Sequence, residues 1–258
     1  MLLAIDVGNT QTQFGVFDTG GELAGEWRLS THREWTADEL GVSIRTLLEL
    51  EDIPVGAIEG IVAASVVPPL TAALQGMGER YFGRAPLMVS ADLVDDLPIL
   101  YEPAAAVGAD RIVNAVAARE KYGAPVVVVD FGTATTFDVV DAQGAYLGGV
   151  IATGIGVSAD ALFQRAARLP RVHIEEPAQV IGRDTTGSVQ SGLFYGYAEL
   201  VDGLLRRIVA ELGTTPQVVA TGGWSATIGS ACKNVDRVDP LLTLEGLRLI
   251  FARYAPPR

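Results

Sequence analysis

The feature that most constrains the fold of this chain is a hairpin-like segment that occurs twice, about half a chain length apart. The first copy, residues 2–17, reads LLAIDVGNTQTQFGVF: a short apolar run, an Asp-x-Gly turn and a second strand-like run. A shift of 124 positions brings it onto residues 126–151, VVVVDFGTATTFDVVDAQGAYLGGVI. This shift pairs Asp6 with Asp130, Gly8 with Gly132, Thr12 with Thr136, Gly20 with Gly144 and Gly25 with Gly149. A unit that occurs only twice, with a period near half the chain, predicts a duplicated lobe and not a solenoid.

Each copy brings a carboxylate, a glycine and small polar side chains to one turn. Gly8 lets a ligand approach bare backbone, while Asn9 and Thr10 offer neutral hydrogen-bonding groups. Asp6 can hold a hydrated cation. A nucleotide triphosphate with its magnesium needs this combination, although the first copy alone fits a tight hairpin with a solvated Asp equally well. The second copy favours two facing lobes that hold a polyphosphate in the cleft between their hairpins.

The rest of the chain alternates strand-like and helical patterns. The spacing predicts strands over 22–29, 60–67, 87–90 and 217–221, and helices over 36–50, 71–81, 112–122, 156–168, 187–212 and 244–254. Thr36 and Glu39 have the spacing of a capping box, and Asp184 can cap the longest helix. We therefore expect an α/β fold with an N-terminal lobe over 1–118 and a C-terminal lobe over 119–258.

Composition excludes several classes of function. The net charge is −12 over 258 residues, and no basic patch of the kind that binds nucleic acid is present. A single cysteine, Cys232, cannot form an internal disulfide and is expected to be an inert apolar residue. There is no signal-peptide pattern and no apolar run of membrane-spanning length. We therefore expect a cytoplasmic protein that binds neither nucleic acid nor membranes.

Asp110 is the strongest candidate for a catalytic side chain outside the two hairpins. It lies in Gly108-Ala109-Asp110-Arg111, at the predicted start of a helix, where backbone N–H groups favour anions. Asp110 could accept the proton of an attacking hydroxyl, and Arg111 could hold an anionic group. From spacing alone, a helix N-terminal Asp with a local salt bridge explains the pattern better.

Two glycine-rich stretches and the histidines carry weaker signals. Thr221-Gly222-Gly223 ends a strand, and fits an ordinary turn or a platform for a ring or ribose equally well. Residues 154–159, GIGVSA, match a dinucleotide-binding pattern, but the strand before them belongs to a hairpin meander and not to a βαβ unit. There is no Walker A sequence, and His32 and His173 are isolated in polar surroundings, which predicts surface roles.

Six motifs taken in order resemble the type III pantothenate kinases along the whole chain. They are D-V-G-N-T at 6–10, G-A-D-R at 108–111, D-F-G-T-A-T-T-F-D at 130–138, G-G-V-I-A-T-G-I at 148–155, T-G-G at 221–223 and L-T-L-E-G-L at 242–247. The resemblance implies duplicated ribonuclease H-like lobes, as in the superfamily of acetate kinase, sugar kinases, Hsp70 and actin, each lobe a mixed sheet flanked by helices. It also implies phosphorylation by ATP of the terminal hydroxyl of pantothenate, the first step of coenzyme A synthesis.

The same resemblance assigns roles to individual residues. Asp110 would be the catalytic base, Asp130 would bind a monovalent cation, K⁺ or NH₄⁺, and Asp6 would hold the Mg²⁺ of ATP through water. The implied contacts to ATP are Asp6, Val7, Gly8, Asn9, Thr10, Gln11, Thr12, Gln13 and Thr133. The implied contacts to pantothenate are Tyr101, Gly108, Ala109, Asp110, Arg111 and Thr185. A homodimer with the pantothenate pocket near its interface is implied as well. Gln11 and Gln13 stand at positions that vary in the family's first motif.

Two other functions compete with this interpretation. The first is another small-molecule kinase of the same superfamily, which would use the same hairpins with a different acceptor. The second is a non-enzymatic regulator similar to the Bvg accessory factors. The acidic net charge and the presence of all three aspartates, Asp6, Asp110 and Asp130, weigh against the regulator.

Overall fold

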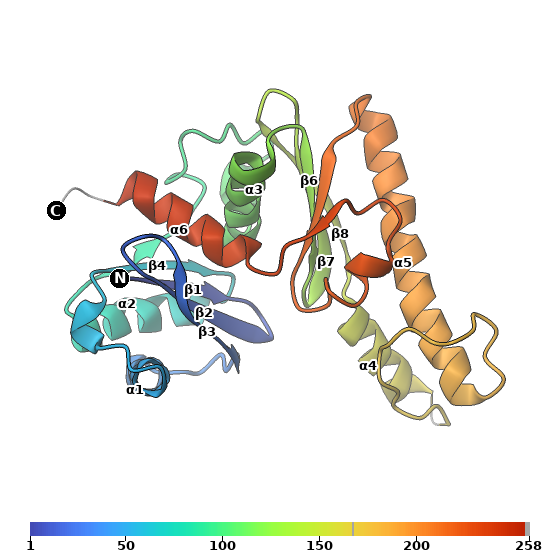
Figure 1. Ribbon diagram of the computed structural model, residues 1–258, viewed down its shortest axis with the longest axis horizontal. Coiled ribbons are helices and arrows are strands. Elements are labelled where there is room, and N and C mark those ends of the chain that lie inside the picture. Colours follow the sequence, from blue (N-terminus) through green and yellow to red (C-terminus); the bar gives the residue numbers. More distant parts are fainter. Residues whose placement is uncertain (167, 256–258) are drawn as a thin grey trace. The chain divides into compact units, whose positions relative to one another are not determined.

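The computed structural model describes residues 1–166 and 168–255 and contains two compact units (Figure 1). The first unit comprises Met1–Ala117 and Leu242–Arg258, and the second comprises Ala118–Leu241. Each unit is built on its own five-stranded mixed sheet. The chain is therefore an α/β protein with two similar lobes, as the repeated hairpin predicts.

The sheet of the first unit has the strand order β3-β2-β1-β4-β5. Its strands are β1 (Leu2–Val7), β2 (Gln11–Phe17), β3 (Leu23–Ser30), β4 (Gly60–Ser65) and β5 (Leu87–Met88). Strands β1 to β3 form an antiparallel meander, whereas β4 is parallel to β1 and β5 is parallel to β4. Because the central strands β1 and β4 are buried on both faces, they are almost continuously apolar.

Helices cover both faces of this sheet. On one face lie α1 (Ala37–Leu50) and α2 (Pro68–Phe82), whose Leu40 and Leu74 pack in one core with Ile5 and Phe14 of the strands. The predicted capping box starts α1, since the Glu39 amide donates to Thr36 Oγ1 at 3.2 Å and the Thr36 amide donates to the Glu39 carboxylate at 2.8 Å. A short 3₁₀ turn, η1 (Val55–Ala57), leads into β4.

The last helix, α6 (Leu242–Tyr254), packs against β1, β2 and β4 of the first unit. Gly15 and Gly60 leave the space that Leu244 and Phe251 of this helix occupy. The predicted division into residues 1–118 and 119–258 placed this segment in the C-terminal lobe. The compact units differ from that division because the contacts of α6 are with the first sheet, which is distant in sequence.

The sheet of the second unit has the order β10-β9-β6-β7-β8, so its strands repeat the topology of the first. They are β6 (Val126–Phe131), β7 (Ala134–Val140), β8 (Tyr146–Thr153), β9 (Gln217–Thr221) and β10 (Arg237–Val238). The helix α3 (Ala109–Tyr122) starts in the first unit and ends in the second. The two-residue strand β10 was not predicted, because nothing in so short a segment distinguishes it from a loop.

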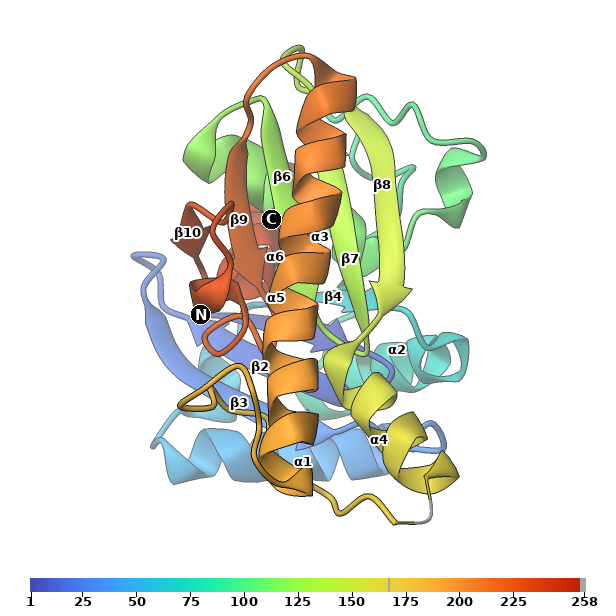
Figure 2. The same cartoon turned by 90° about the vertical axis from the view of Figure 1, so that its right-hand side faces the viewer.

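The long helix α5 (Thr185–Leu212) lies along one face of the second sheet (Figure 2). Its Phe194, Val201 and Leu205 pack in one core with Val129 and Phe137 of the strands. Asp184 caps it as predicted, since the Gly187 amide donates to Asp184 Oδ1 at 2.7 Å. The shorter helix α4 (Ile155–Arg165) ends earlier than predicted. Within the described ranges, no helix combines the length and apolar character needed to cross a bilayer.

The two hairpins match in structure, but the match corrects the predicted alignment by one residue. The shift of 124 holds up to the turn, for Asp6 with Asp130 and Gly8 with Gly132. After the turn the shift is 123, because Asp6 is opposite Gln13 whereas Asp130 is opposite Thr136. The turn of the second hairpin is therefore one residue shorter. The structural partners of Thr12, Gly21 and Gly25 are accordingly Thr135, Gly144 and Gly148.

The next turn confirms the corrected shift. Asp18 Oδ1 accepts from the amides of Gly20 and Glu22 at 2.8 and 2.9 Å. Asp141 Oδ1 accepts in the same way from the amides two and four residues later, both at 2.9 Å. Gly21 and Gly144 each adopt a positive φ here, +86° and +81°. The repeat thus extends through the whole three-stranded meander.

Candidate active site

The first hairpin turn presents polar groups at the end of β1. The Gly8 amide donates to Gln11 O at 3.0 Å, and a Cβ on Gly8 would lie 2.9 Å from that same oxygen. Asn9, Thr10 and Gln11 are exposed around the turn, and Asp6 is half-buried two residues before Gly8. This turn therefore offers amide and hydroxyl groups beside one carboxylate.

The other predicted ATP contacts of this hairpin differ in how far their side chains are exposed. The side chains of Val7 and Thr12 are buried, which leaves their backbone for a contact with a ligand. Thr12 Oγ1 pairs with Thr31 Oγ1 at 2.8 Å, and Thr31 Oγ1 donates to Gly8 O at 2.8 Å. Gln13 Nε2 donates to Glu26 at 2.8 Å. The side chains of Asn9, Thr10 and Gln11 are exposed, and that of Gln13 is half-buried.

The second hairpin has the same design and is joined by a helix N-terminus. The Gly132 amide donates to Ala134 O at 3.0 Å, and Gly132 and Thr133 are exposed. Gly154, the N-cap of α4, donates its amide to Thr133 O at 3.1 Å. A Cβ on Gly154 would collide with Thr133 O and lie 2.6 Å from Gly132 O, so only glycine fits. The first turn of α4 therefore lies against the hairpin that carries Thr133.

The sequence interpretation missed this helix N-terminus. It treated residues 154–159 as a misleading match to a dinucleotide-binding pattern. The glycine of that pattern does serve a close backbone approach, but the approach is to the hairpin of a meander. Free N–H groups at a helix start favour anions, so the first residues of α4 join the candidate phosphate-binding groups.

Asp130 lies at the end of β6 against the turn that follows β9. Thr221 is its direct neighbour in the sheet. Gly222 has a φ of +89°, and a Cβ there would overlap Asp130 Oδ1. The Ser225 amide and Oγ both donate to Gly222 O, at 3.1 and 2.7 Å. The Thr221-Gly222-Gly223 stretch is therefore a tight turn in which Gly222 makes room for the Asp130 carboxylate.

Asp110 stands in the first turn of α3, in the first unit. Its Oδ1 accepts from the Arg111 amide at 2.8 Å and lies 2.5 Å from the position of a Cβ on Gly108. Burial raises the pKa of the Asp110 carboxyl above its usual value, although the hydrogen bond from Arg111 and the charge of Arg111 oppose the rise. Arg111 itself is buried, at 8% exposure. Asp110 is half-buried, and a partly desolvated carboxylate with a raised pKa is a stronger base than one fully in water.

A pocket of about 400 Å³ adjoins the start of α3 within the first unit. Its walls come from the end of β4, from the segment after β5 and from the residues that precede α3. They are Ser65, Val66, Val89, Ser90, Ala91, Asp92, Ala105, Ala106, Val107, Gly108 and Ala109. Ala104–Ala106 form the 3₁₀ turn η2, and the half-buried Tyr101 lies shortly before it. The predicted pantothenate contacts Tyr101 and Gly108–Arg111 thus all lie in the first unit, and two of them, Gly108 and Ala109, line this pocket.

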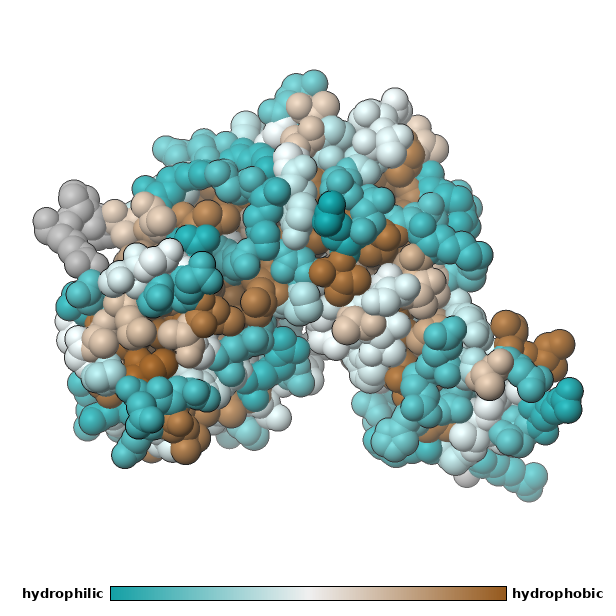
Figure 3. Space-filling view, in the orientation of Figure 1, coloured by the Kyte–Doolittle hydropathy of each residue, from teal (hydrophilic) through white to brown (hydrophobic). Residues whose placement is uncertain are grey.

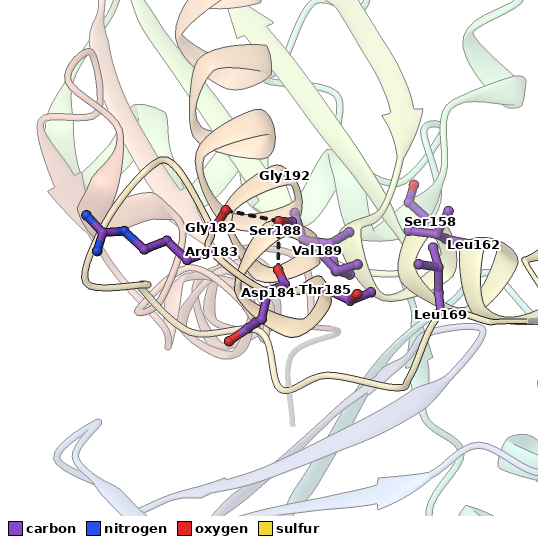
Figure 4. Close-up of a pocket in the computed structure, with 11 residues that line it drawn as sticks. Ser158, Leu162, Leu169, Gly182, Arg183, Asp184, Thr185, Ser188, Val189 and Gly192 are labelled. Atoms are coloured by element: carbon purple, nitrogen blue, oxygen red, sulfur yellow. Dashed lines mark hydrogen bonds between the residues drawn. The ribbon is translucent and has the colours of Figure 1, made fainter.

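Thr185, the remaining predicted pantothenate contact, lies in the second unit. It lines a different pocket, of about 830 Å³, between α4 and the start of α5. Figure 4 shows Thr185 and Val189 on the side of α5 that faces Leu162 and Leu169, whereas Arg183 points away. Ser188 Oγ donates to Asp184 O at 2.7 Å and to Gly182 O at 3.4 Å, which holds the loop before the helix.

The remaining candidates behave as the sequence predicts. His32 and His173 are exposed. Cys232 is buried, and desolvation raises the pKa of its thiol to about 12, with Asp202 and Glu199 adding to the rise. In the part of the chain that the structure describes, no three or more His, Cys, Asp or Glu residues gather as a metal cluster.

Comparison with known proteins finds similar sequences along nearly the whole chain. The profile described as type III pantothenate kinase matches residues 2–207. A type III pantothenate kinase of Koribacter versatilis is 52% identical over 262 residues, which cover 98% of this chain and 96% of the relative. One of Anaeromyxobacter sp. strain K is 50% identical over 253 residues, which cover 98% and 99%.

Solved structures support the fold. A Sinorhizobium meliloti protein provisionally described as a 2-dehydro-3-deoxygalactonokinase superposes with a TM-score of 0.60 at 12% sequence identity. The superposition covers 100% of this chain and 98% of that one. At such low identity the similarity concerns the fold alone, and it agrees with the architecture of two α/β lobes described above.

Proposed function

This chain belongs to the type III pantothenate kinase family, and we propose that it is a pantothenate kinase in which Asp110 is the general base. It moves the terminal phosphoryl group of ATP to the terminal hydroxyl of pantothenate and forms 4'-phosphopantothenate, the first step of coenzyme A synthesis. The observation that carries the role of Asp110 is its environment: a half-buried carboxylate with a raised pKa, at a helix start beside a pocket of about 400 Å³.

Asp110 accepts the proton of the pantothenate hydroxyl as that oxygen attacks the γ-phosphorus. Its Oδ1 is held by the Arg111 amide, so the carboxylate has a fixed direction. The acceptor occupies the pocket that Gly108 and Ala109 line, with Tyr101 and Arg111 as the further contacts we assign in the first unit. Thr185, in the second unit, is a separate assignment that rests on the family resemblance. A positioned base contributes about 10²–10⁴ in rate, and the rest of the acceleration comes from positioning and charge neutralisation.

The two hairpins and the start of α4 bind the phosphates of ATP. Asn9, Thr10 and Gln11 of the first hairpin and Thr133 of the second are exposed, as a ligand contact requires. Free amides at the start of α4 add a helix N-terminus to the Thr133 hairpin. Because the sequence contains no P-loop lysine, neutral donors and cations offset the charge of the triphosphate.

Two cations complete the site. Asp6 holds the Mg²⁺ of ATP through water, and Asp130 holds a monovalent cation, K⁺ or NH₄⁺. The donors fit these ions because both are hard oxygens, and the half-buried Asp130 has room for its Oδ1 because Gly222 lacks a Cβ. When bound, the cations neutralise charge on the phosphates. Among the described residues, Asp130 belongs to no cluster of three or more His, Cys, Asp or Glu side chains, and a single carboxylate suits a singly charged ion.

We further propose a homodimer formed through the surface around α4 and the segment before α5, close to Thr185. The support is an exposed group of apolar side chains there: Val157, Leu162, Val180 and Ile181, the last 81% exposed. Figure 3 shows brown, apolar atoms at the tip of the segment before α5. Light scattering should give twice the mass of one chain, and Ile181→Asp should halve it. A wild-type monomer would contradict this assignment. The expected location is the cytoplasm.

A coupled assay of ADP release with pantothenate, acetate and a panel of sugars tests the activity. Asp110→Asn should lower kcat by about 10²–10⁴ with an unchanged KM for ATP. Asp95→Asn, which alters an exposed aspartate of the same unit, should leave kcat as it is. Near-normal turnover of Asp110→Asn would remove Asp110 from the base role. Turnover of a sugar or acetate without pantothenate would indicate another kinase of the superfamily.

A further inference from the structure

We propose that the hydroxyl of Thr221 is a ligand of the monovalent cation at Asp130, an inference that rests on the cation role given to Asp130 in the proposed function. Thr221 is the last residue of β9 and is only 1% exposed. Its Oγ1 is buried and has no hydrogen-bond partner among the described residues. Burying an unpaired hydroxyl is unfavourable, and a bound cation would satisfy this oxygen.

The sheet register places the Thr221 side chain beside the Asp130 carboxylate. Asp130 and Thr221 are direct partners on the neighbouring parallel strands β6 and β9. Directly opposite residues of paired strands project on the same face of a sheet. Gly222 follows, and its missing Cβ leaves the space in which Asp130 Oδ1 lies. A carboxylate oxygen and a buried hydroxyl oxygen therefore occupy adjacent positions on one face.

Thr136 lies next to Asp130 on the other side, so Thr221, Asp130 and Thr136 form one row across three neighbouring strands. It is the direct partner of Asp130 on β7 and so lies on the same face. Its Oγ1 donates to Asp138 Oδ2 at 3.3 Å, and the fully buried Asp138 also accepts from Tyr146 Oη at 2.8 Å. Because the hydroxyl hydrogen of Thr136 is directed at Asp138, the lone pairs of its oxygen remain for another partner. Thr136 Oγ1 is the second hydroxyl ligand that this arrangement provides.

The composition of the row defines the class of cation. Three hard oxygens with one direct carboxylate match a singly charged, oxygen-preferring ion such as K⁺. Zinc sites are built mainly from several Cys, His and carboxylate ligands, and no three His, Cys, Asp or Glu residues gather in this way among the described residues. Backbone oxygens and the phosphates of a bound nucleotide would supply the remaining ligands. Thr221 is thus a specificity-determining residue for the cation.

Thr135 provides a matched control, because it has the same chemistry on the opposite face. Its Oγ1 is also buried without a hydrogen-bond partner among the described residues, and it is 1% exposed. It is the direct partner of Phe131, one residue beyond Asp130, and therefore projects away from the Asp130 face. In the first unit the equivalent Thr12 pairs with Thr31, but Gly154 replaces Thr31 in the second. The Thr135 hydroxyl is therefore unpaired because the second lobe has a glycine where the first lobe has a threonine.

The test follows the thermal midpoint of the full chain in a potassium chloride series, with ADP saturating and tetramethylammonium chloride holding the ionic strength constant. Without potassium, Thr221→Val and Thr135→Val should both raise the midpoint, because each replaces an unpaired buried hydroxyl by a methyl group. With potassium, the thermal midpoint should rise. We call the potassium concentration that gives half of this rise the half-point, and it should be the same for wild type and Thr135→Val. Thr221→Val should need at least about tenfold more potassium, since even outer-shell partners change metal affinity about 10–100-fold.

Three further variants complete the design. Thr221→Ser keeps the oxygen and should retain the wild-type half-point, whereas Thr221→Ala should behave like Thr221→Val and covers the case that the valine variant does not fold. A half-point for Thr221→Val and Thr221→Ala equal to that of Thr135→Val would overturn the role of Thr221. An equal response of wild type and Asp130→Asn, including no response in either, would instead refute the cation site of the proposed function.

Discussion

Asp110 Oδ1 lies 2.5 Å from the point that a Cβ atom on Gly108 would occupy. Both residues belong to the segment Gly108-Ala109-Asp110-Arg111. Because Gly108 has no side chain, the Asp110 carboxylate can occupy this position. The second unit repeats the relationship, because the missing Cβ of Gly222 leaves room for the carboxylate of Asp130. In both units a glycine determines where a candidate functional aspartate lies.

Gly108→Ala should therefore impair catalysis more than folding. The new methyl group would displace the Asp110 carboxylate, and a shift of about 1 Å at a reacting group can lower the rate about 10²-fold. Steady-state kinetics should show a lower kcat, with a thermal midpoint close to that of wild type. Gly56→Ala is the control, because a Cβ there meets nothing within 4 Å. Equal kcat values for the two variants would show that Asp110 tolerates the displacement.

Gly222→Ala should destabilise the second unit by about 1–3 kcal/mol, because an L-residue is strained at a positive φ. The φ of Gly222 is +89°, and the added Cβ would overlap Asp130 Oδ1. Urea unfolding measures the loss. Gly196→Ala, on α5 with open space around it, should be neutral or stabilising by up to about 1 kcal/mol. Unchanged stability of Gly222→Ala would mean that the turn can adopt another conformation.

The raised pKa of Asp110 predicts how stability depends on pH. Because burial raises its pKa in the folded state, the folded chain binds this proton more tightly than the unfolded chain does. Between the usual aspartate value, about 3.9, and the raised value, stability therefore falls as pH rises, and it stays lower above that window. Asp110→Asn lacks this titration. The stability of the variant relative to wild type should increase from acid to neutral pH in urea unfolding experiments, and a pH-independent difference would contradict the raised pKa.

Asp239→Asn should cost about 1.5–3 kcal/mol of unfolding free energy, the usual range for hydrogen bonds to a charged group. The buried Asp239 accepts from Lys121 Nζ at 2.5 Å and Tyr122 Oη at 2.7 Å, both at the end of α3. Its other oxygen accepts from the Leu241 amide at 3.2 Å, next to the start of α6. The exposed pair of Lys233 and Glu199, at 3.8 Å, is the comparison. Glu199→Gln should change stability by less than about 1 kcal/mol, and an equal effect of the two substitutions would count against the Asp239 network.

Cys232 should resist thiol reagents in the folded protein. A thiol with a pKa of about 12 is almost entirely protonated at neutral pH, and the thiolate is the reactive form. Ellman's reagent at pH 8 should therefore label the native chain far more slowly than the chain in urea. Rapid labelling of the native protein would mean that the segment around η3 (Gly229–Ala231) opens readily.

The sequence by itself determined the parts of this protein that local patterns encode. Period-two and period-3.6 patterns fixed the strands of the two meanders and the helices, because those periods reflect which side of each element is buried. The Thr36 and Asp184 caps followed from side chains that bond amides three residues away. The ordered motifs from D-V-G-N-T to L-T-L-E-G-L determined the family, and with it the reaction.

Only the tertiary structure decided how distant segments meet. It placed α6 on the first sheet, although the elements that come just before this helix in the sequence belong to the second unit. It revealed the one-residue-shorter second turn, which a uniform shift between the repeats conceals. It also showed that Gly108 and Gly222 serve aspartate side chains, and that Thr221 buries a hydroxyl beside Asp130. These features depend on strand register and on contacts across the fold, and no local pattern records either, because neighbours in a sheet come from separate parts of the chain.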